Sequence, residues 1–378
     1  MPKVTAFCCS ALVSLVFQYS AANAGELIAT PGSEECDFLF SGEVENGDAL
    51  KIQEGIPSTY SGTTLCLDSP GGSIAEGTKM FHAIWGKDSV ATRVQSEAEC
   101  QSACALAFLG GSLVIGTGAV RSQNAMIEPG AVLGFQPPRL VLSGDDLHRA
   151  SEVADAYALA LTDVGEIFKL TQVQQNGVSG MSDLLFSEIL ETPPSSTYDI
   201  DTIGKASLAG IQVSGVPTPE LSWDRLTNVC DTAYLLVEAH AHNLDPESDM
   251  FSFVPKTGPD GEGNALSAED RFWRWDDGMF MNFVIRGYPA PSVNETLCRI
   301  ELSKFAFERE QALPISKRDP SIHNFTVSLW WDAQVPTGEA FADYAQSPPP
   351  VRETLSVPWS ALWPPQTPLN SFIAAPND

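Results

Sequence analysis

A short apolar segment that leads through a glycine turn into a helical segment constrains the fold of this chain most. Thr63–Leu67 has the composition of a buried strand, ends in Asp68-Ser69-Pro70-Gly71-Gly72-Ser73, and is followed by a helical pattern over Ile74–Trp85. Short, wholly apolar strands are typical of parallel sheets that are covered on both faces. Other predicted strands of the first half are Phe38–Gly42, Val90–Val94, Val114–Ile115 and Val132–Phe135. This alternation predicts an α/β domain with a largely parallel sheet and flanking helices.

The helical segments of the first region are followed, after Pro219, by a region with a different pattern. Helical spacing continues over Ser102–Leu109, Asp145–Val173, Asp183–Leu190 and Ile203–Ala209. Beyond Pro219, segments such as Phe280–Ile285 and Phe325–Trp330 alternate as antiparallel strands do. We therefore expect an α/β domain over residues 25–215 and a mainly β domain over 220–345. Residues 346–378 are rich in proline, which predicts an irregular tail.

Residues 1–24 are typical of a signal peptide. Lys3 supplies the positive charge, Val4–Phe17 is almost wholly apolar, and Ala22-Asn23-Ala24 is a small-x-small cleavage site. A membrane span needs about 20 apolar residues, so an uncleaved anchor is only the second interpretation. The sequence predicts a periplasmic or secreted protein with no stable membrane span after cleavage.

The chain is strongly acidic, with 48 Asp and Glu residues against 21 Lys and Arg and a formal net charge of -27. Nucleic acids and anionic membranes repel such a protein, so neither is an expected partner. The acidic residues are scattered rather than gathered into a tail. That distribution favours a solvated surface over a cation-binding role.

Six cysteines lie beyond the predicted signal peptide, and an even number in an exported protein favours disulfides. Six cysteines allow fifteen pairings. Cys230 and Cys298 are the two cysteines of the second domain, Cys36 and Cys66 flank neighbouring strands, and Cys100 and Cys104 are then left for each other. Zinc is the alternative ligand of the last pair, but no second close pair or nearby histidine completes a site. We expect no metal and no cofactor.

A second motif, Cys100-Gln101-Ser102-Ala103-Cys104, opens an apolar helical segment about thirty residues after the glycine turn. A serine at a helix N-terminus is most often a cap. It can also be a nucleophile, because the free N–H groups and the helix dipole stabilise negative charge there. Paired glycines such as Gly71 and Gly72 let a backbone N–H approach a developing oxyanion.

In this order and spacing, the two motifs resemble the proteolytic subunit of Clp protease and its exported relatives, including signal peptide peptidase A. The matching segments are Ser69-Pro70-Gly71-Gly72 and Ser102–Phe108 with the following Gly110-Gly111. The Cys-x-Ser-Ala-Cys form is similar to a periplasmic branch of this Clp protease/crotonase superfamily. The resemblance extends over about Phe38–Val213 and covers none of the chain after Pro219.

The resemblance implies a role for individual residues. Ser102 falls on the nucleophile, and the N–H groups of Gly72 and Ala103 fall on the oxyanion hole. The acidic residue of the family corresponds to Asp199, with Asp201 as the near alternative. The resemblance also implies a peptide or protein ligand and leaves room for a homo-oligomer.

The sequence departs from this family at the catalytic base. Where the family has a histidine before proline at the end of a strand, this chain has Gln136, and a neutral amide cannot accept the proton of serine. His82 and His148 are the histidines of the matching region, and each is an alternative base. Lys79 and Lys169 are further alternatives, although no motif supports either lysine.

Several functions are compatible with these residues. The leading hypothesis is an exported, catalytically impaired serine-peptidase homologue that keeps a peptide-binding cleft. The second is an active serine endopeptidase with a non-standard base such as His82. An enzyme acting on acyl-coenzyme A is a third, which export disfavours because that cofactor is cytosolic. In the fourth, the C-terminal β domain binds a partner and the first half is its scaffold.

Overall fold

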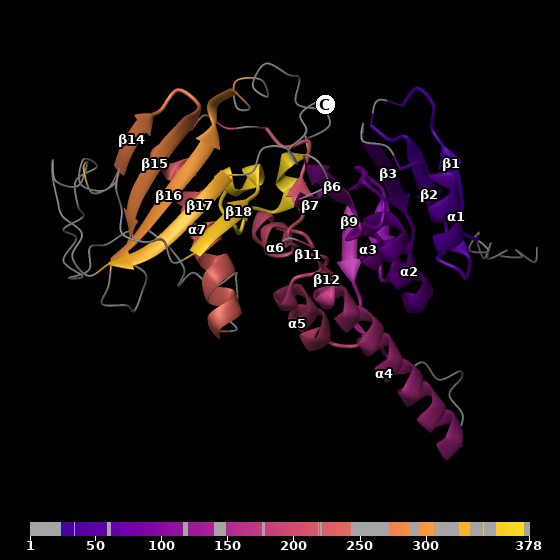
Figure 1. The fold of residues 1–378 in the computed structure, drawn as a ribbon. Helices are drawn as coiled ribbons and strands as arrows, with labels where there is room; N and C mark the ends of the chain where they lie inside the picture. The colour runs from indigo at the N-terminus through magenta and orange to yellow at the C-terminus, as the bar shows by residue number, and fades with distance from the viewer. Residues whose placement is uncertain are drawn as a thin grey trace, which may run out of the picture.

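The chain folds around two main hydrophobic cores, each built on its own sheet (Figure 1). The computed structural model describes residues 24–33, 35–58, 62–115, 120–139, 149–175, 178–217, 219, 221–242, 272–287, 295–305, 308, 325–332, 343 and 353–373. The predicted signal peptide, apart from Ala24, and His148 lie outside the described residues.

The sheet of the first half is mixed, with parallel strands at its centre. Its strands are β1 (Glu26–Ala29), β2 (Phe38–Ser41), β3 (Thr63–Asp68), β4 (Ser89–Val94), β6 (Ser112–Ile115), β7 (Val120–Gln123), β8 (Ala125–Ile127) and β13 (Gln212–Val213). The neighbours β2–β3, β3–β4, β4–β8 and β8–β13 run parallel. The pairs β1–β2, β4–β6 and β6–β7 are antiparallel. The expected α/β architecture with a parallel-containing sheet is therefore confirmed.

A second, small sheet contains the start of the serine motif and the strand that leads to Gln136. It consists of β5 (Glu99–Gln101), β9 (Val132–Phe135) and β12 (Tyr198–Asp199), in the order β12-β9-β5. A hairpin of β10 (Gln174–Gln175) and β11 (Val178–Ser179) lies apart from it.

The helices of the first half are α1 (Asp48–Gly55), α2 (Ile74–Trp85), α3 (Ala103–Phe108), α4 (Ala150–Gln172), α5 (Asp183–Glu191) and α6 (Ile203–Leu208). Ser73 caps α2 by accepting the Glu76 N–H, and Met80 and Phe81 bury its apolar face completely. Gly77 lets α2 approach α3 closely, because a Cβ there would collide with the Ala103 carbonyl. Helix α4 projects away from the rest of the chain (Figure 1).

The C-terminal region forms a separate, wholly antiparallel sheet covered by one long helix. The strands β14 (Phe272–Asp276), β15 (Phe280–Gly287), β16 (Glu295–Ser303), β17 (Phe325–Asp332) and β18 (Glu353–Val357) pair in chain order. Helix α7 (Trp223–His242) shares a core with one face of this sheet. Two 3-10 turns, η3 (Trp359–Leu362) and η4 (Leu369–Phe372), follow β18.

The structure differs from two local expectations. Residues 353–357 form the edge strand β18, although 346–378 was expected to be irregular, because β17 offers these residues a hydrogen-bonding partner. The sequence pattern also predicts no helix between the strands Phe38–Gly42 and Thr63–Leu67, but Asp48–Gly55 forms helix α1.

Three disulfides join the cysteine pairs that the sequence predicts. Cα–Cα distances are 5.7 Å for Cys36–Cys66, 5.1 Å for Cys100–Cys104 and 6.0 Å for Cys230–Cys298. Disulfides form and persist in oxidising compartments, which is compatible with a periplasmic or extracellular location. None of the described helices is both long and apolar enough to cross a membrane.

Candidate functional site

The glycine turn and the serine motif adjoin one another in the fold. Ser69 donates its N–H to the Glu99 carbonyl at 2.6 Å, and Gln101 donates its own to the Ser69 carbonyl at 3.1 Å. Gly71 has a φ of +105°, and a Cβ there would lie 2.6 Å from the Gln101 carbonyl oxygen and 2.9 Å from the Ser102 Cβ. Only glycine combines this conformation with such a close approach.

Ser102 occupies a strained turn between β5 and α3. Its φ of 52° and ψ of -116° lie outside the regions that side chains other than glycine usually adopt, at a cost of about 1–3 kcal/mol. Its N–H donates to the Gly134 carbonyl at 2.8 Å, and its carbonyl accepts the Leu106 N–H at 3.2 Å. The hydroxyl does not cap the helix, so the capping role considered for this serine is absent. A sharp strand-to-helix turn of this kind is how a nucleophile is presented to a substrate.

Ser102 and Gln136 line the same cavity, which has a volume of about 440 Å³. Its walls come from the glycine turn and the start of α2, from the segment after β9, and from α4. The lining residues are Pro70, Gly72, Ser73, Ile74, Ala75, Ser102, Gln136, Pro137, Pro138, Arg139, Leu159 and Asp163. Ser102, Gln136 and Gly72, which the resemblance places at the nucleophile, the base and the oxyanion hole, thus line one cavity.

Two backbone N–H groups near the serine are not used by the described part of the fold. Val44 donates its N–H to the Gly71 carbonyl at 2.7 Å and accepts the Ser73 N–H at 3.0 Å. The intervening Gly72 N–H donates to no described residue, and the same is true of Ala103, the first residue of α3. Gly72 lines the cavity, whereas Ala103 is fully buried and does not line it.

Of the two aspartates considered for the acidic position, Asp199 is better placed than Asp201. Asp199 pairs with Gly134 across the small sheet, and a Cβ on Gly134 would lie 2.7 Å from its Oδ1. Partial burial, helped by the charge of Asp201, raises the pKa of Asp199 despite the opposing charge of Lys205. Asp201 forms an ion pair with Lys205 at 2.8 Å. Asp199 does not line the cavity itself; it lies beside the strand that leads to Gln136.

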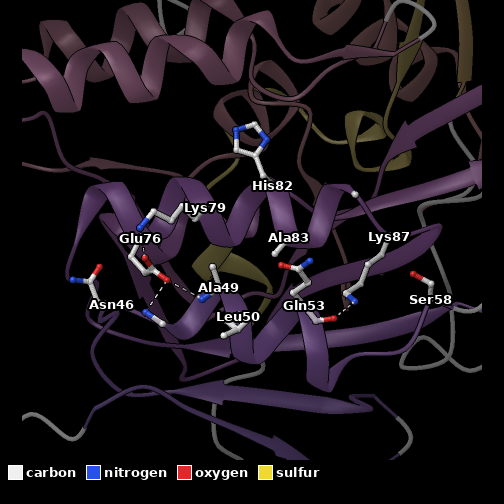
Figure 2. Close-up of a pocket in the computed structure, with 12 residues that line it drawn as sticks. Asn46, Ala49, Leu50, Gln53, Ser58, Glu76, Lys79, His82, Ala83 and Lys87 are labelled. Atoms are coloured by element: carbon white, nitrogen blue, oxygen red, sulfur yellow. Dashed lines mark hydrogen bonds and ion pairs between the residues drawn. The ribbon is translucent and has the colours of Figure 1, made fainter.

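His82 lines a different cavity, of about 720 Å³, between α1 and α2 (Figure 2). Its ring meets Phe81 edge-on at 5.3 Å between centroids and points away from the labelled α1 side chains. Burial and the charge of Lys169 lower the pKa of His82, and the charge of Glu166 opposes this shift. A base must lie within hydrogen-bond reach of its nucleophile, directly or through one water. The structure therefore does not bring His82 together with Ser102 in one cavity.

The two lysines considered as bases are engaged with carboxylates. Lys79 forms an ion pair with Glu76 at 2.9 Å, and Lys169 forms one with Glu166 at 2.5 Å. Neither lysine lines the Ser102 cavity. Among the described residues, no group of three or more His, Cys, Asp or Glu side chains is arranged to hold a metal ion.

Three wall residues of the Ser102 cavity have no sequence signal. Arg139 follows the segment that contains Gln136, and Leu159 and Asp163 come from the middle of α4. Burial and the neighbouring charge of Glu166 raise the pKa of Asp163. The helical pattern predicts α4, but it does not indicate which turn of the helix reaches the cavity.

No known protein family model matches this chain, and no curated protein matches it. The resemblance to Clp protease relatives therefore depends on the two sequence motifs alone.

Proposed function

We propose that this chain is an exported serine-peptidase-like protein of the Clp protease/crotonase type that binds peptides and has lost most of its catalytic power. The observation that carries the proposal is that Ser102 and Gln136 line one cavity next to the glycine turn. A serine on a strained turn, near a Gly72 N–H that no described residue accepts, has the form of a nucleophile beside an oxyanion site.

The fold is consistent with this proposal. Parallel strands with helical crossovers bring the loops that follow the strands to one edge of a sheet. Here the turn after β3 of the main sheet meets the turn after β5 of the small sheet, held by the hydrogen bonds of Ser69 with Glu99 and Gln101. The Cys100–Cys104 disulfide closes the turn that carries Ser102. A preformed site of this kind can bind a peptide whether or not it cleaves one.

The loss of catalysis follows from the chemistry of Gln136. An amide cannot remove the serine proton, so the hydroxyl has the reactivity of an ordinary alcohol. Removing the base of a triad lowers the rate by several powers of ten and leaves only the oxyanion hole and binding. In the alternative function, an active endopeptidase, His82 would be the base, and its place in a separate cavity weighs against that role.

A fluorophosphonate probe tests the proposal. The wild-type protein should label slowly, and Gln136→His should label faster because an imidazole next to Ser102 can act as a base. Ser102→Ala is the matched control and should abolish any labelling. Rapid labelling and peptide turnover by the wild type, both lost in Ser102→Ala, would contradict the proposal. Loss of that turnover in His82→Ala would then identify His82 as the base.

A further inference from the structure

One wall of the Ser102 cavity carries a carboxylate that the described part of the fold does not neutralise. Asp163 on α4 is half-buried and lines the cavity with Ser102 and Gln136. No hydrogen bond or ion pair joins its side chain to a described residue. The next carboxylate along α4, Glu166, is paired with Lys169.

The groups around Asp163 do not supply a partner from the other walls. The start of α2 contributes the apolar Ile74 and Ala75, and the segment after β9 contributes the neutral Gln136. The cation on the cavity wall is Arg139, which is exposed and forms no ion pair with Asp163. The charged group that affects the pKa of Asp163 is therefore Glu166, which has the same sign.

A half-buried carboxylate with no partner among the described residues favours a ligand that brings a positive charge. Burial and Glu166 both disfavour the ionised form of Asp163, and an ammonium or guanidinium group would offset both effects. The formal net charge of -27 acts in the same direction at long range, because it attracts cationic ligands and speeds their association.

We propose that the Ser102 cavity selects peptides with a basic side chain, lysine or arginine, and that Asp163 is the residue that binds this side chain. The inference rests on the proposed peptide-binding function and adds its specificity. Asp163 is a specificity-determining residue here and takes no part in the chemistry at Ser102.

Three peptides of the form Ac-Ala-Leu-X-Ala-Leu-Ala-NH2, with X as lysine, norleucine or glutamate, test the specificity by calorimetric titration of the full mature chain. Norleucine matches the aliphatic part of lysine without its charge. A charge-assisted hydrogen bond should make the lysine peptide bind about tenfold more tightly than the norleucine peptide, and the glutamate peptide should bind most weakly. Asp163→Asn should bring the lysine and norleucine affinities together, and Asp163→Glu should keep part of the preference.

Asp155→Asn is the matched control, because it removes one negative charge from the exposed part of α4, away from the cavity wall. It should leave the ratio of the lysine and norleucine affinities unchanged. This result separates a direct contact with Asp163 from long-range electrostatic attraction. The preference for lysine should also weaken on acidification, beginning at a pH above the ordinary aspartate pKa of about 3.9, because the pKa of Asp163 in the free protein is raised.

The outcomes separate this inference from the function on which it rests. Equal binding of the lysine and norleucine peptides to the wild type would overturn the role of Asp163 but would not contradict the proposed peptide-binding function. A preference that persists in Asp163→Asn, in protein whose thermal unfolding matches the wild type, would also overturn it. Absence of binding by all three peptides would overturn both proposals.

Discussion

At the scale of single residues, Gly71 decides whether the two motifs can touch. At its positive φ, any residue other than glycine has a modest conformational free-energy cost. In addition, the Gln101 carbonyl and the Ser102 Cβ occupy the space where a side chain would begin. Gly32 has a similar φ of +90° with nothing within 4 Å of its Cβ position. Alanine substitutions at Gly71 and at Gly32 therefore separate the free-energy cost of the backbone conformation from that of the close approach.

We predict that Gly71→Ala destabilises the protein more than Gly32→Ala does. The backbone cost of about 1 kcal/mol is common to both variants, and the collision adds about 1–3 kcal/mol at Gly71 alone. Urea denaturation of the two variants measures the difference. Equal free energies of unfolding would show that the glycine turn can move away from Ser102 without cost.

The site was partly predictable from the sequence because its key residues lie in two short motifs. Gly72 and Gln136 each follow a predicted strand, and the ends of such strands meet at one edge of a sheet. Ser102 follows no predicted strand and is identified by its motif alone. Asp163 and Leu159 could not be predicted, because they reach the cavity from the middle of a helix. No residue pattern within α4 indicates which turn of that helix lies near Ser102.

At the scale of elements, helix α1 is held at both ends by residues of another segment (Figure 2). The buried Glu76 accepts the Gly47 and Ala49 N–H groups at 3.0 Å each, where α1 begins. Lys87 donates to the Gln53 and Ile56 carbonyls at 2.9 and 2.5 Å, where α1 ends. An acid at the N-terminus and a base at the C-terminus both match the helix dipole. These stabilising residues are 27 or more positions away in sequence, which explains why the local sequence pattern predicts no helix there.

We predict that Glu76→Gln destabilises the protein at neutral pH by about 1–3 kcal/mol, because it removes a buried charge that accepts two backbone N–H groups. Burial would raise the pKa of Glu76, but the hydrogen bonds from Lys79, Ala49 and Gly47 lower it. A carboxyl with a lowered pKa in the folded state stabilises fully above its unfolded pKa and loses that effect as the pH falls through its folded pKa. The difference between the two proteins should therefore shrink below about pH 4.3, the ordinary glutamate value.

Thermal unfolding of the wild type and Glu76→Gln across this pH range measures the effect. Lys79→Met is the control, because it removes the exposed partner and keeps the two backbone hydrogen bonds, and it should cost less than 1 kcal/mol. A difference between wild type and Glu76→Gln that does not change with pH would refute the role of the charge.

At the scale of the whole molecule, the last described residues join the two cores. Trp359 and Leu362 of η3 pack in the core of the C-terminal sheet, whereas Leu369 packs in the core of the first half. Backbone hydrogen bonds fix this crossing: Leu369 donates to the Asp201 carbonyl at 2.8 Å, and Ile203 donates to the Thr367 carbonyl at 3.1 Å. The proline-rich composition predicted an irregular tail. It does not indicate that one leucine of this tail packs in a core distant in sequence.

We predict that Leu369→Ala destabilises the first half of the protein by about 2–5 kcal/mol, although the residue follows the C-terminal sheet in sequence. Leu369 is 3% exposed, and its replacement leaves a cavity in the core of the first half. Ile373→Ala is the control, since that side chain is 50% exposed and its loss should cost less than about 1.5 kcal/mol. Amide hydrogen exchange locates the effect: Ile203 and Gly204, which donate to the Thr367 and Pro365 carbonyls, should exchange faster in Leu369→Ala. Unchanged protection of these two amides would mean that the tail lies on the first core without stabilising it.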